Sequence, residues 1–194
     1  LPLLVDRVFD EDVATPLTVY AREETLAAVQ AHLFNDVIWP DFGKLPTEEN
    51  PMLRYRVCGP GDTVGIGHRN FHAVEVMHSV PSLGFTVQNS GGVFAVSGDT
   101  KSNETLWPVL NACDDLKVLV IEVSFPDEMA SLAQDSGHYT PKSLTEDLER
   151  LRHEPEIWLT GMKPGEEQRI FRQVVKAVPD KNIQMLSRGT VLTV

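Results

Sequence analysis

Residues 93–100 read VFAVSGDT, an apolar run that stops at a small polar turn. Val93 to Val96 combine β-branched, aromatic and small apolar side chains, which is typical of a buried strand. The turn that follows places one carboxylate, Asp99, at the end of this strand. Because α/β proteins keep their ligand sites at strand ends, the stretch predicts a sheet with a functional residue at its edge.

Outward from this strand, the pattern predicts mostly strands before it and alternating helices and strands after it. Earlier in the chain we expect a strand at 16–20, a helix at 21–34, and short strands at 52–58, 63–66, 71–78, 84–89 and 92–97. Later we expect helices at 103–113, 141–153 and 165–178, strands at 116–123 and 156–160, and a last β pair, IQML and TVLTV. This order predicts an α/β (α+β) fold: a largely antiparallel sheet that continues into a layer covered by helices, in one domain, 1–194.

The composition is that of an ordinary globular protein. With 194 residues and 42% hydrophobic residues, the chain can bury a substantial core. Its formal net charge of −11 disfavours a nucleic-acid partner. No apolar run approaches the roughly 18 residues that span a bilayer, and no signal-peptide pattern is present, so we expect a soluble, cytoplasmic protein with no membrane contact. Cys58 and Cys113 are expected to be buried thiols.

Four side chains suited to catalysis or metal binding lie near the ends of predicted strands: His78, Asp99, Glu122 and His138. Imidazole nitrogen and carboxylate oxygen are natural ligands of zinc, manganese or iron, and a carboxylate can bridge two such ions. Each residue alone has a simpler interpretation, since a histidine is often a surface or loop residue and an aspartate often forms a turn. Together they favour a functional site.

Seven stretches, in this order, give the chain a resemblance to a known family: LPLLVDRVF (1–9), FNDVIWPDF (34–42), HSVPSLGF (78–85), SGDT (97–100), EVSF (122–125), GHYTPKSL (137–144) and LTGMKPG (159–165). With them the chain resembles the metallo-β-lactamase superfamily of hydrolases, and within it the class II cyclic-nucleotide phosphodiesterases. The resemblance implies an αββα sandwich, of which these residues would form the C-terminal two-thirds.

The resemblance also implies roles for the four polar residues. His78 would bind one metal and Asp99 would bridge two divalent ions, zinc first, with manganese or iron as alternatives. In the related transfer-RNA 3′-processing enzymes a histidine in a GHST-like stretch assists the chemistry and an acidic residue orients it, which implies His138 as general acid and Glu122 as its partner. A metal-activated hydroxide would open a cyclic 3′,5′-nucleotide to the 5′-monophosphate. The implied partners are this small-molecule nucleotide and a second copy of the chain in a homodimer.

The loop from Asn35 to Pro51 is too long and irregular for a simple connector. Within it we expect Asn35 and Trp39 to border the substrate, with Trp39 stacking on the nucleobase. Core packing is an equally good interpretation of Trp39.

Two departures from the family pattern concern metal ligands. The HxHxDH motif, which the resemblance places shortly before LPLLVDRV, does not occur in the sequence, so we expect the chain to start inside the domain. The histidines that remain lack its spacing, and we interpret them as structural or solvent-facing: His32, His68, His72 and His153. The second departure is Gly161, which stands where similar sequences have a metal-binding histidine. His78 and Asp99 alone fall short of the four ligands that zinc usually takes.

Two other functions stay open at this point. The chain can be a non-catalytic member of the fold that acts as a binding or assembly subunit after losing ligands such as the one at Gly161. It can also be a transfer-RNA 3′-processing endonuclease, which the net charge of −11 disfavours. The metal content separates the non-catalytic interpretation from the hydrolase.

Overall fold

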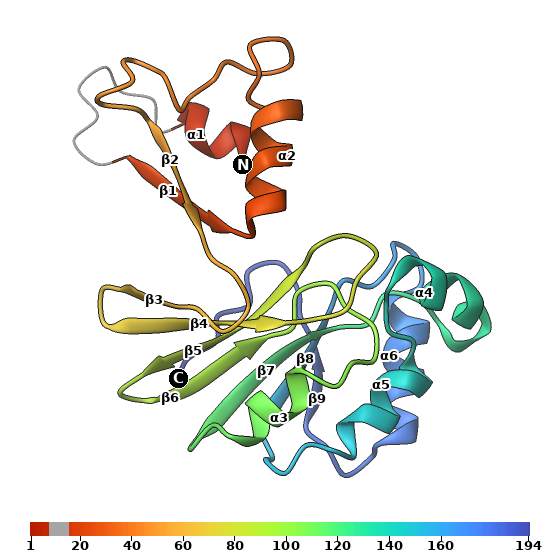
Figure 1. Cartoon of the computed structure of the whole chain (residues 1–194). Helices are drawn as coiled ribbons and strands as arrows, with labels where there is room; N and C mark the ends of the chain where they lie inside the picture. Colours follow the sequence, from red (N-terminus) through yellow and green to blue (C-terminus); the bar gives the residue numbers. More distant parts are fainter. Residues whose placement is uncertain (8–15) are drawn as a thin grey trace. The chain divides into compact units, whose positions relative to one another are not determined.

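The computed structural model describes residues 1–7 and 16–194, which form two compact units, Leu1–Gly59 and Pro60–Val194 (Figure 1). Val8 and Phe9, the end of the first family-like stretch, lie outside the described residues. The single domain expected for residues 1–194 stays a prediction.

The first unit contains two helices and a two-stranded sheet: α1 (Pro2–Arg7), β1 (Leu17–Ala21), α2 (Glu23–His32) and β2 (Leu53–Val57). β1 and β2 are parallel, with Leu17 opposite Leu53. The prediction that β2 joins the antiparallel sheet is therefore wrong. Parallel neighbours need a long crossover connection, and α2 with the loop after it provides one. Phe34 and Phe42 pack edge to face in the core of this unit, with ring centroids 5.6 Å apart.

The second unit is built on one mixed sheet in the order β3-β4-β5-β6-β7-β8-β9. Its strands are β3 (Thr63–Ile66), β4 (Arg69–Glu75), β5 (Leu83–Asn89), β6 (Gly92–Val96), β7 (Leu116–Glu122), β8 (Glu156–Thr160) and β9 (Ile183–Met185). β3 to β6 pair antiparallel, as predicted, while β6 to β9 are parallel. The strand predicted at TVLTV is wrong. A turn closed by the Thr190 N–H on the Ser187 carbonyl separates this segment from β9, and the Val194 carbonyl accepts a side-chain bond from Asn89 instead of ladder bonds.

Helices cover one face of this sheet (Figure 1). They are α3 (Leu106–Asn111), α5 (Pro141–Leu148) and α6 (Glu167–Ala177), and their apolar side chains share a core with alternate residues of β6, β7 and β8. Two short elements that the sequence did not predict, the 3₁₀ helix η1 (Asp127–Met129) and α4 (Ala130–Ser136), follow β7. Because β6, β7 and β8 are parallel, the residues after each strand meet at one edge of the sheet. Asp99, Glu122 and Gly161 come to that edge.

Candidate active site

His78 lies in the connection between β4 and β5 and is oriented by a backbone carbonyl. Its Nδ1 is 3.0 Å from the carbonyl oxygen of Gly137. A carbonyl can only accept, so Nδ1 carries the proton and Nε2 keeps its lone pair. A histidine fixed in this way through one nitrogen is typical of a metal ligand that uses the other.

The loop that carries Asp99 is tied directly to the loop that carries His78. The Lys101 N–H donates to the Met77 carbonyl at 2.8 Å, and the Met77 N–H donates to the Thr100 hydroxyl at 3.1 Å. Met77 precedes His78 and Thr100 follows Asp99, so the two candidate ligands come from adjoining positions on paired loops. The Asp99 carboxylate is exposed.

Glu122 ends β7, is 1% exposed and accepts hydrogen bonds on both oxygens. Its Oε1 lies 2.9 Å from His138 Nδ1 and also accepts from the backbone N–H of Thr100 at 3.1 Å and of Tyr139 at 3.3 Å. Its Oε2 lies 3.1 Å from the Ser124 hydroxyl. The predicted pairing of Glu122 with His138 is thus present in the structure.

The electrostatic setting of this pair comes mainly from burial. Burial raises the pKa of Glu122 to about 8, the charge of Asp99 acts in the same direction, and the hydrogen bonds to the carboxylate oppose it. Burial is also the main cause that lowers the pKa of His138; the neighbouring His78 and Lys163 act in the same direction, and Asp99 acts to raise it. Near neutral pH the Glu122–His138 pair therefore holds one proton between Oε1 and Nδ1, a suitable arrangement for proton transfer.

Gly137 allows the two histidines to meet. The His78 and His138 rings are in edge contact, with centroids 4.7 Å apart. Gly137 has φ = +80°, and a β-carbon at this position would lie 2.6 Å from the Ser79 nitrogen and 2.9 Å from the His78 α-carbon. A side chain there is excluded by both the backbone conformation and the lack of space, so the glycine of the GHYT stretch is structurally required.

Gly161, the position where the resemblance expects a histidine, follows β8 next to Glu122. Its φ is +74°, and a β-carbon would lie 3.4 Å from the Glu122 β-carbon, an ordinary contact. Its carbonyl oxygen is 3.1 Å from the Ser124 hydroxyl, which can donate to it or to Glu122. Gly161 supplies no side-chain donor.

A metal centre is only partly provided by this chain. His78 Nε2 and the Asp99 carboxylate are suitable donors, but within residues 1–7 and 16–194 no group of three or more His, Cys, Asp or Glu side chains could hold an ion. The residues present therefore fit part of a metal site and not the full ligand set of zinc.

Sequence reasoning missed three contributors: Ser124, Gly137 and Lys163. Ser124 and Lys163 lie within the family-like stretches EVSF and LTGMKPG, and Gly137 begins GHYT. The signal was therefore in the quoted stretches. Their roles depend on contacts between loops that the sequence does not reveal.

Asn35 and Trp39, the predicted substrate-binding residues, belong to the first unit. The Asn35 side-chain oxygen accepts from the backbone N–H of Val37 and of Ile38 at 3.1 and 3.0 Å, and its amide donates to Ala31 at 3.1 Å. Trp39 is partly buried against the apolar cluster of this unit. These contacts shape the loop, and binding of a nucleobase by either residue stays a prediction.

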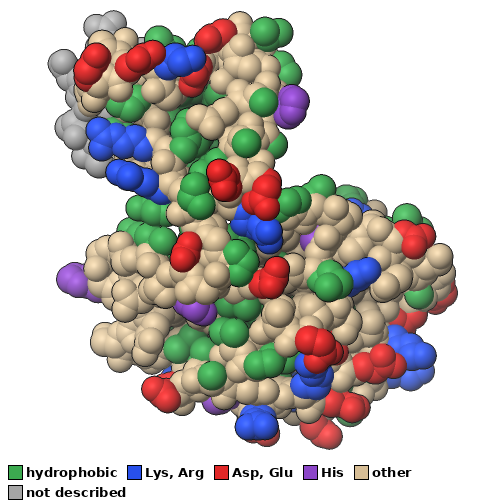
Figure 2. Space-filling model, in the orientation of Figure 1, with side chains coloured by type: hydrophobic (Ala, Val, Ile, Leu, Met, Phe, Trp, Pro, Cys, Tyr) green, Lys and Arg blue, Asp and Glu red, His purple; other side chains and the backbone are tan. Residues whose placement is uncertain are grey.

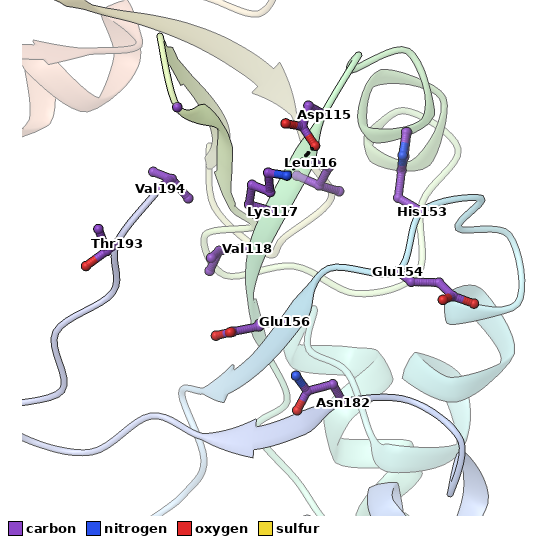
Figure 3. A pocket seen from close by; sticks show the side chains of 11 residues that line it. Asp115, Leu116, Lys117, Val118, His153, Glu154, Glu156, Asn182, Thr193 and Val194 are labelled. Carbon is purple, nitrogen blue, oxygen red and sulfur yellow. Dashed lines mark ion pairs between the residues drawn. The ribbon is translucent and has the colours of Figure 1, made fainter.

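A separate cavity lies at the opposite ends of the strands (Figure 3). Asp115 and Lys117 at the start of β7 line it as an ion pair 2.9 Å long, together with Glu156 at the start of β8 and with His153. α/β folds keep their chemistry at the carboxyl ends of parallel strands, and this cavity lies at the amino ends. We therefore place the candidate active site at the His78 and His138 cluster.

No family model matches the chain. The protein named "Probable 3′,5′-cyclic-nucleotide phosphodiesterase" of Yersinia pestis is 27% identical over an alignment of 149 positions, and the alignment covers 69% of this chain and 43% of that protein. The structure of unliganded yeast PDE1 aligns with a TM-score of 0.78 and 19% identity, and the alignment covers 95% of this chain and 61% of the PDE1 chain. The structure of the metallo-β-lactamase fold protein YhfI from Bacillus subtilis aligns with a TM-score of 0.68 and 13% identity, and the alignment covers 94% of this chain and 68% of the YhfI chain. The chain has the metallo-β-lactamase fold.

The metallo-β-lactamase fold and the resemblance to cyclic-nucleotide phosphodiesterases, both predicted from the sequence, are thereby confirmed. The chain spans less than half of the Yersinia protein and 61% of PDE1. Metallo-β-lactamase-fold proteins typically bind zinc or other divalent metals. Within the part of the chain that the structure describes, no helix is long and apolar enough to cross a bilayer.

Proposed function

We propose that this chain carries the proton-transfer pair and two metal ligands of a metal-dependent phosphodiester hydrolase, which opens a cyclic 3′,5′-nucleotide to the 5′-monophosphate. One observation carries the proposal: His138, held by the buried Glu122, lies in ring contact with His78 at the sheet edge that also bears Asp99. The relationship to the Yersinia protein supports a cyclic nucleotide as the substrate class.

The metal would be held by His78 Nε2 and the Asp99 carboxylate. The HxHxDH motif, which the resemblance implies for the other ligands, does not occur in these 194 residues. When bound, a divalent ion lowers the pKa of water to near 7 and neutralises charge on the phosphoryl group.

His138 would act on the leaving group. Its Nδ1 faces Glu122, so Nε2 is the atom that can reach substrate. With the shared proton on Nδ1 and a second proton on Nε2, the imidazole can protonate the departing 3′ ribose oxygen while Glu122 carries the compensating negative charge. A positioned general acid of this kind contributes about 10²–10⁴-fold in rate.

The test is hydrolysis of 3′,5′-cyclic AMP to 5′-AMP by the purified protein with added zinc or manganese. His138→Ala is expected to lower kcat by about 10²–10⁴-fold. The matched control is His68→Ala, since His68 is exposed on the turn between β3 and β4. The proposal fails if the protein produces no 5′-AMP, or if the two variants are equally active.

A non-catalytic binding or assembly subunit is the second candidate, and the absence of a donor at Gly161 favours it. It predicts no stoichiometric metal, whereas the hydrolase predicts one or two ions per chain. Metal analysis by mass spectrometry after purification in zinc-containing buffer separates the two. The homodimer stays a prediction.

A transfer-RNA 3′-processing endonuclease is supported least. Such a substrate needs a basic surface along its phosphate backbone. On the face of the second unit visible in Figure 2, Lys and Arg side chains are interspersed with Asp and Glu.

A further inference from the structure

We propose that Lys163 is the anion-binding residue of the candidate site: its ammonium group holds a non-bridging oxygen of the phosphodiester while His138 meets the leaving oxygen. This inference rests on the proposed function, because it assigns a substrate group to a residue of the same site.

The backbone of Lys163 is attached to the end of β7. Its N–H donates to the Ser124 carbonyl at 3.1 Å, and its own carbonyl accepts from the Glu166 N–H at 3.0 Å. Ser124 is 2% exposed, and its hydroxyl lies 3.1 Å from His138 Nδ1. One buried residue thus positions both the Lys163 main chain and the His138 ring.

The side chain of Lys163 extends over the ring of Phe125. Nζ lies 5.1 Å from the ring centroid, within the range of a cation–π interaction. The His138 ring meets the same phenyl ring at a centroid distance of 5.7 Å. The ammonium and the imidazole thus both contact Phe125, and we infer that they act on one phosphate.

Lys163 also lacks a counter-charge. Among the described residues no carboxylate pairs with it, although acidic residues outnumber basic ones by 28 to 17. Lys117 and Lys44 pair with Asp115 at 2.9 Å and with Asp41 at 2.8 Å, whereas the described lysines without an ion pair also include Lys176, and Lys163 differs from it by its place over Phe125. An ammonium group that is positioned but unpaired is suited to an incoming phosphate oxygen.

The experiment titrates the purified protein with dimethyl phosphate, a diester with no base or sugar, and follows the imidazole signals of His78 and His138 by NMR. Lys163→Gln keeps an alkyl stem over Phe125 and removes the charge. We expect it to weaken binding about tenfold, because a charge-assisted hydrogen bond is lost. Lys163→Arg is expected to bind within about threefold of the wild type, since the guanidinium keeps the charge.

The matched control is Lys176→Gln, at an exposed position in the last turn of α6. It is expected to bind dimethyl phosphate as the wild type does. The proposal is overturned if the wild type does not bind the diester, if Lys163→Gln binds it unchanged, or if both Gln variants lose affinity equally, which would indicate a general charge effect.

Hydrolysis measured on the same proteins separates this proposal from the proposed function. Binding that depends on Lys163 without any hydrolysis supports the anion site and contradicts the hydrolase. Hydrolysis of cyclic AMP with a KM unchanged by Lys163→Gln supports the hydrolase and contradicts the role of Lys163.

Discussion

Gly137→Ala tests whether the close approach of the two histidine-bearing loops depends on a glycine in GHYT. At φ = +80° an L-residue adopts the left-handed conformation at a cost of about 1–2 kcal/mol. The added β-carbon would also lie 2.6 Å from the Ser79 nitrogen, so the β4–β5 connection has to move, and overpacking of this kind costs about 1–3 kcal/mol more. We therefore expect the free energy of unfolding to fall by roughly 2–5 kcal/mol.

Gly165→Ala is the matched control for this variant. Gly165 has φ = +90°, and its added β-carbon would meet no atom within 4 Å. Only the conformational cost of about 1–2 kcal/mol applies. Urea unfolding followed by tryptophan fluorescence measures both variants, with the m-value checked for constancy. If Gly137→Ala loses no more stability than Gly165→Ala, the crowding at Gly137 is refuted.

The same pair of variants has a local readout at the site. In the wild type, ring protons of His78 and His138 are expected to show a nuclear Overhauser effect, because the ring centroids are 4.7 Å apart. Gly165→Ala should keep this signal and Gly137→Ala should weaken it. Equal signals in both variants would show that Gly137 does not set the separation of the rings.

Three further predictions concern other groups of the second unit. Glu122→Gln removes a carboxyl whose pKa rises from 4.5 to about 8 on folding, so its stabilising contribution is complete below pH 4.5 and is lost as the pH rises through 8. Urea unfolding should therefore show the wild type losing stability relative to the variant between these pH values. A difference in stability that stays constant with pH would contradict the pKa shift. Gly161→His is expected to cost about 1–2 kcal/mol because of its positive φ and to tighten zinc binding in equilibrium dialysis; unchanged zinc binding would favour the non-catalytic subunit. Tyr139→Phe removes a 2.6 Å hydrogen bond to the buried Asp147, while Asp147 keeps its 3.1 Å bond from Trp107. This variant should lower the free energy of unfolding by about 1–3 kcal/mol. An unchanged free energy of unfolding would mean that water replaces the hydroxyl.

The parallel half of the sheet could be predicted closely from the sequence. β7 was expected at 116–123 and spans Leu116–Glu122, because a strand buried on both faces has a nearly continuous apolar sequence. α5 was expected to begin at Pro141 and does so. Thr140 caps it by accepting from the Ser143 N–H. In both elements the local sequence and the final fold agree.

The elements that were missed lack such local signals. α4 has seven residues and buries only Ala133, so it shows no apolar periodicity. TVLTV, at 190–194, alternates polar and apolar side chains as a strand does. A strand also needs a neighbouring strand to pair with, and that neighbour is distant in the sequence. The partner of β2 was missed for the same reason.

The candidate site divides in a similar way. His78, Asp99, Glu122 and His138 were singled out by residue type and by the family resemblance, and their roles stay predictions. The groups that orient them could not, because they are backbone atoms and a hydroxyl from distant segments. The carbonyl of Gly137, for example, is 59 positions from the imidazole that it orients.

The buried carboxyl of Glu122 connects the loops of the candidate site. A carboxyl group buried at a strand end costs several kcal/mol unless it is hydrogen-bonded, and an apolar side chain would be the simpler core residue. Here three of its hydrogen-bond donors belong to Thr100, His138 and Tyr139, in the loops that carry or adjoin the predicted site residues. The carboxyl thus connects these loops to one another, and no bond in this network requires a side chain at Gly161. These bonds hold the loops in place in a catalytic and in a non-catalytic protein alike. A buried acid paired with an imidazole also suits proton transfer, which is compatible with the proposed hydrolase, although both the HxHxDH motif and a side-chain donor at Gly161 are absent from these residues.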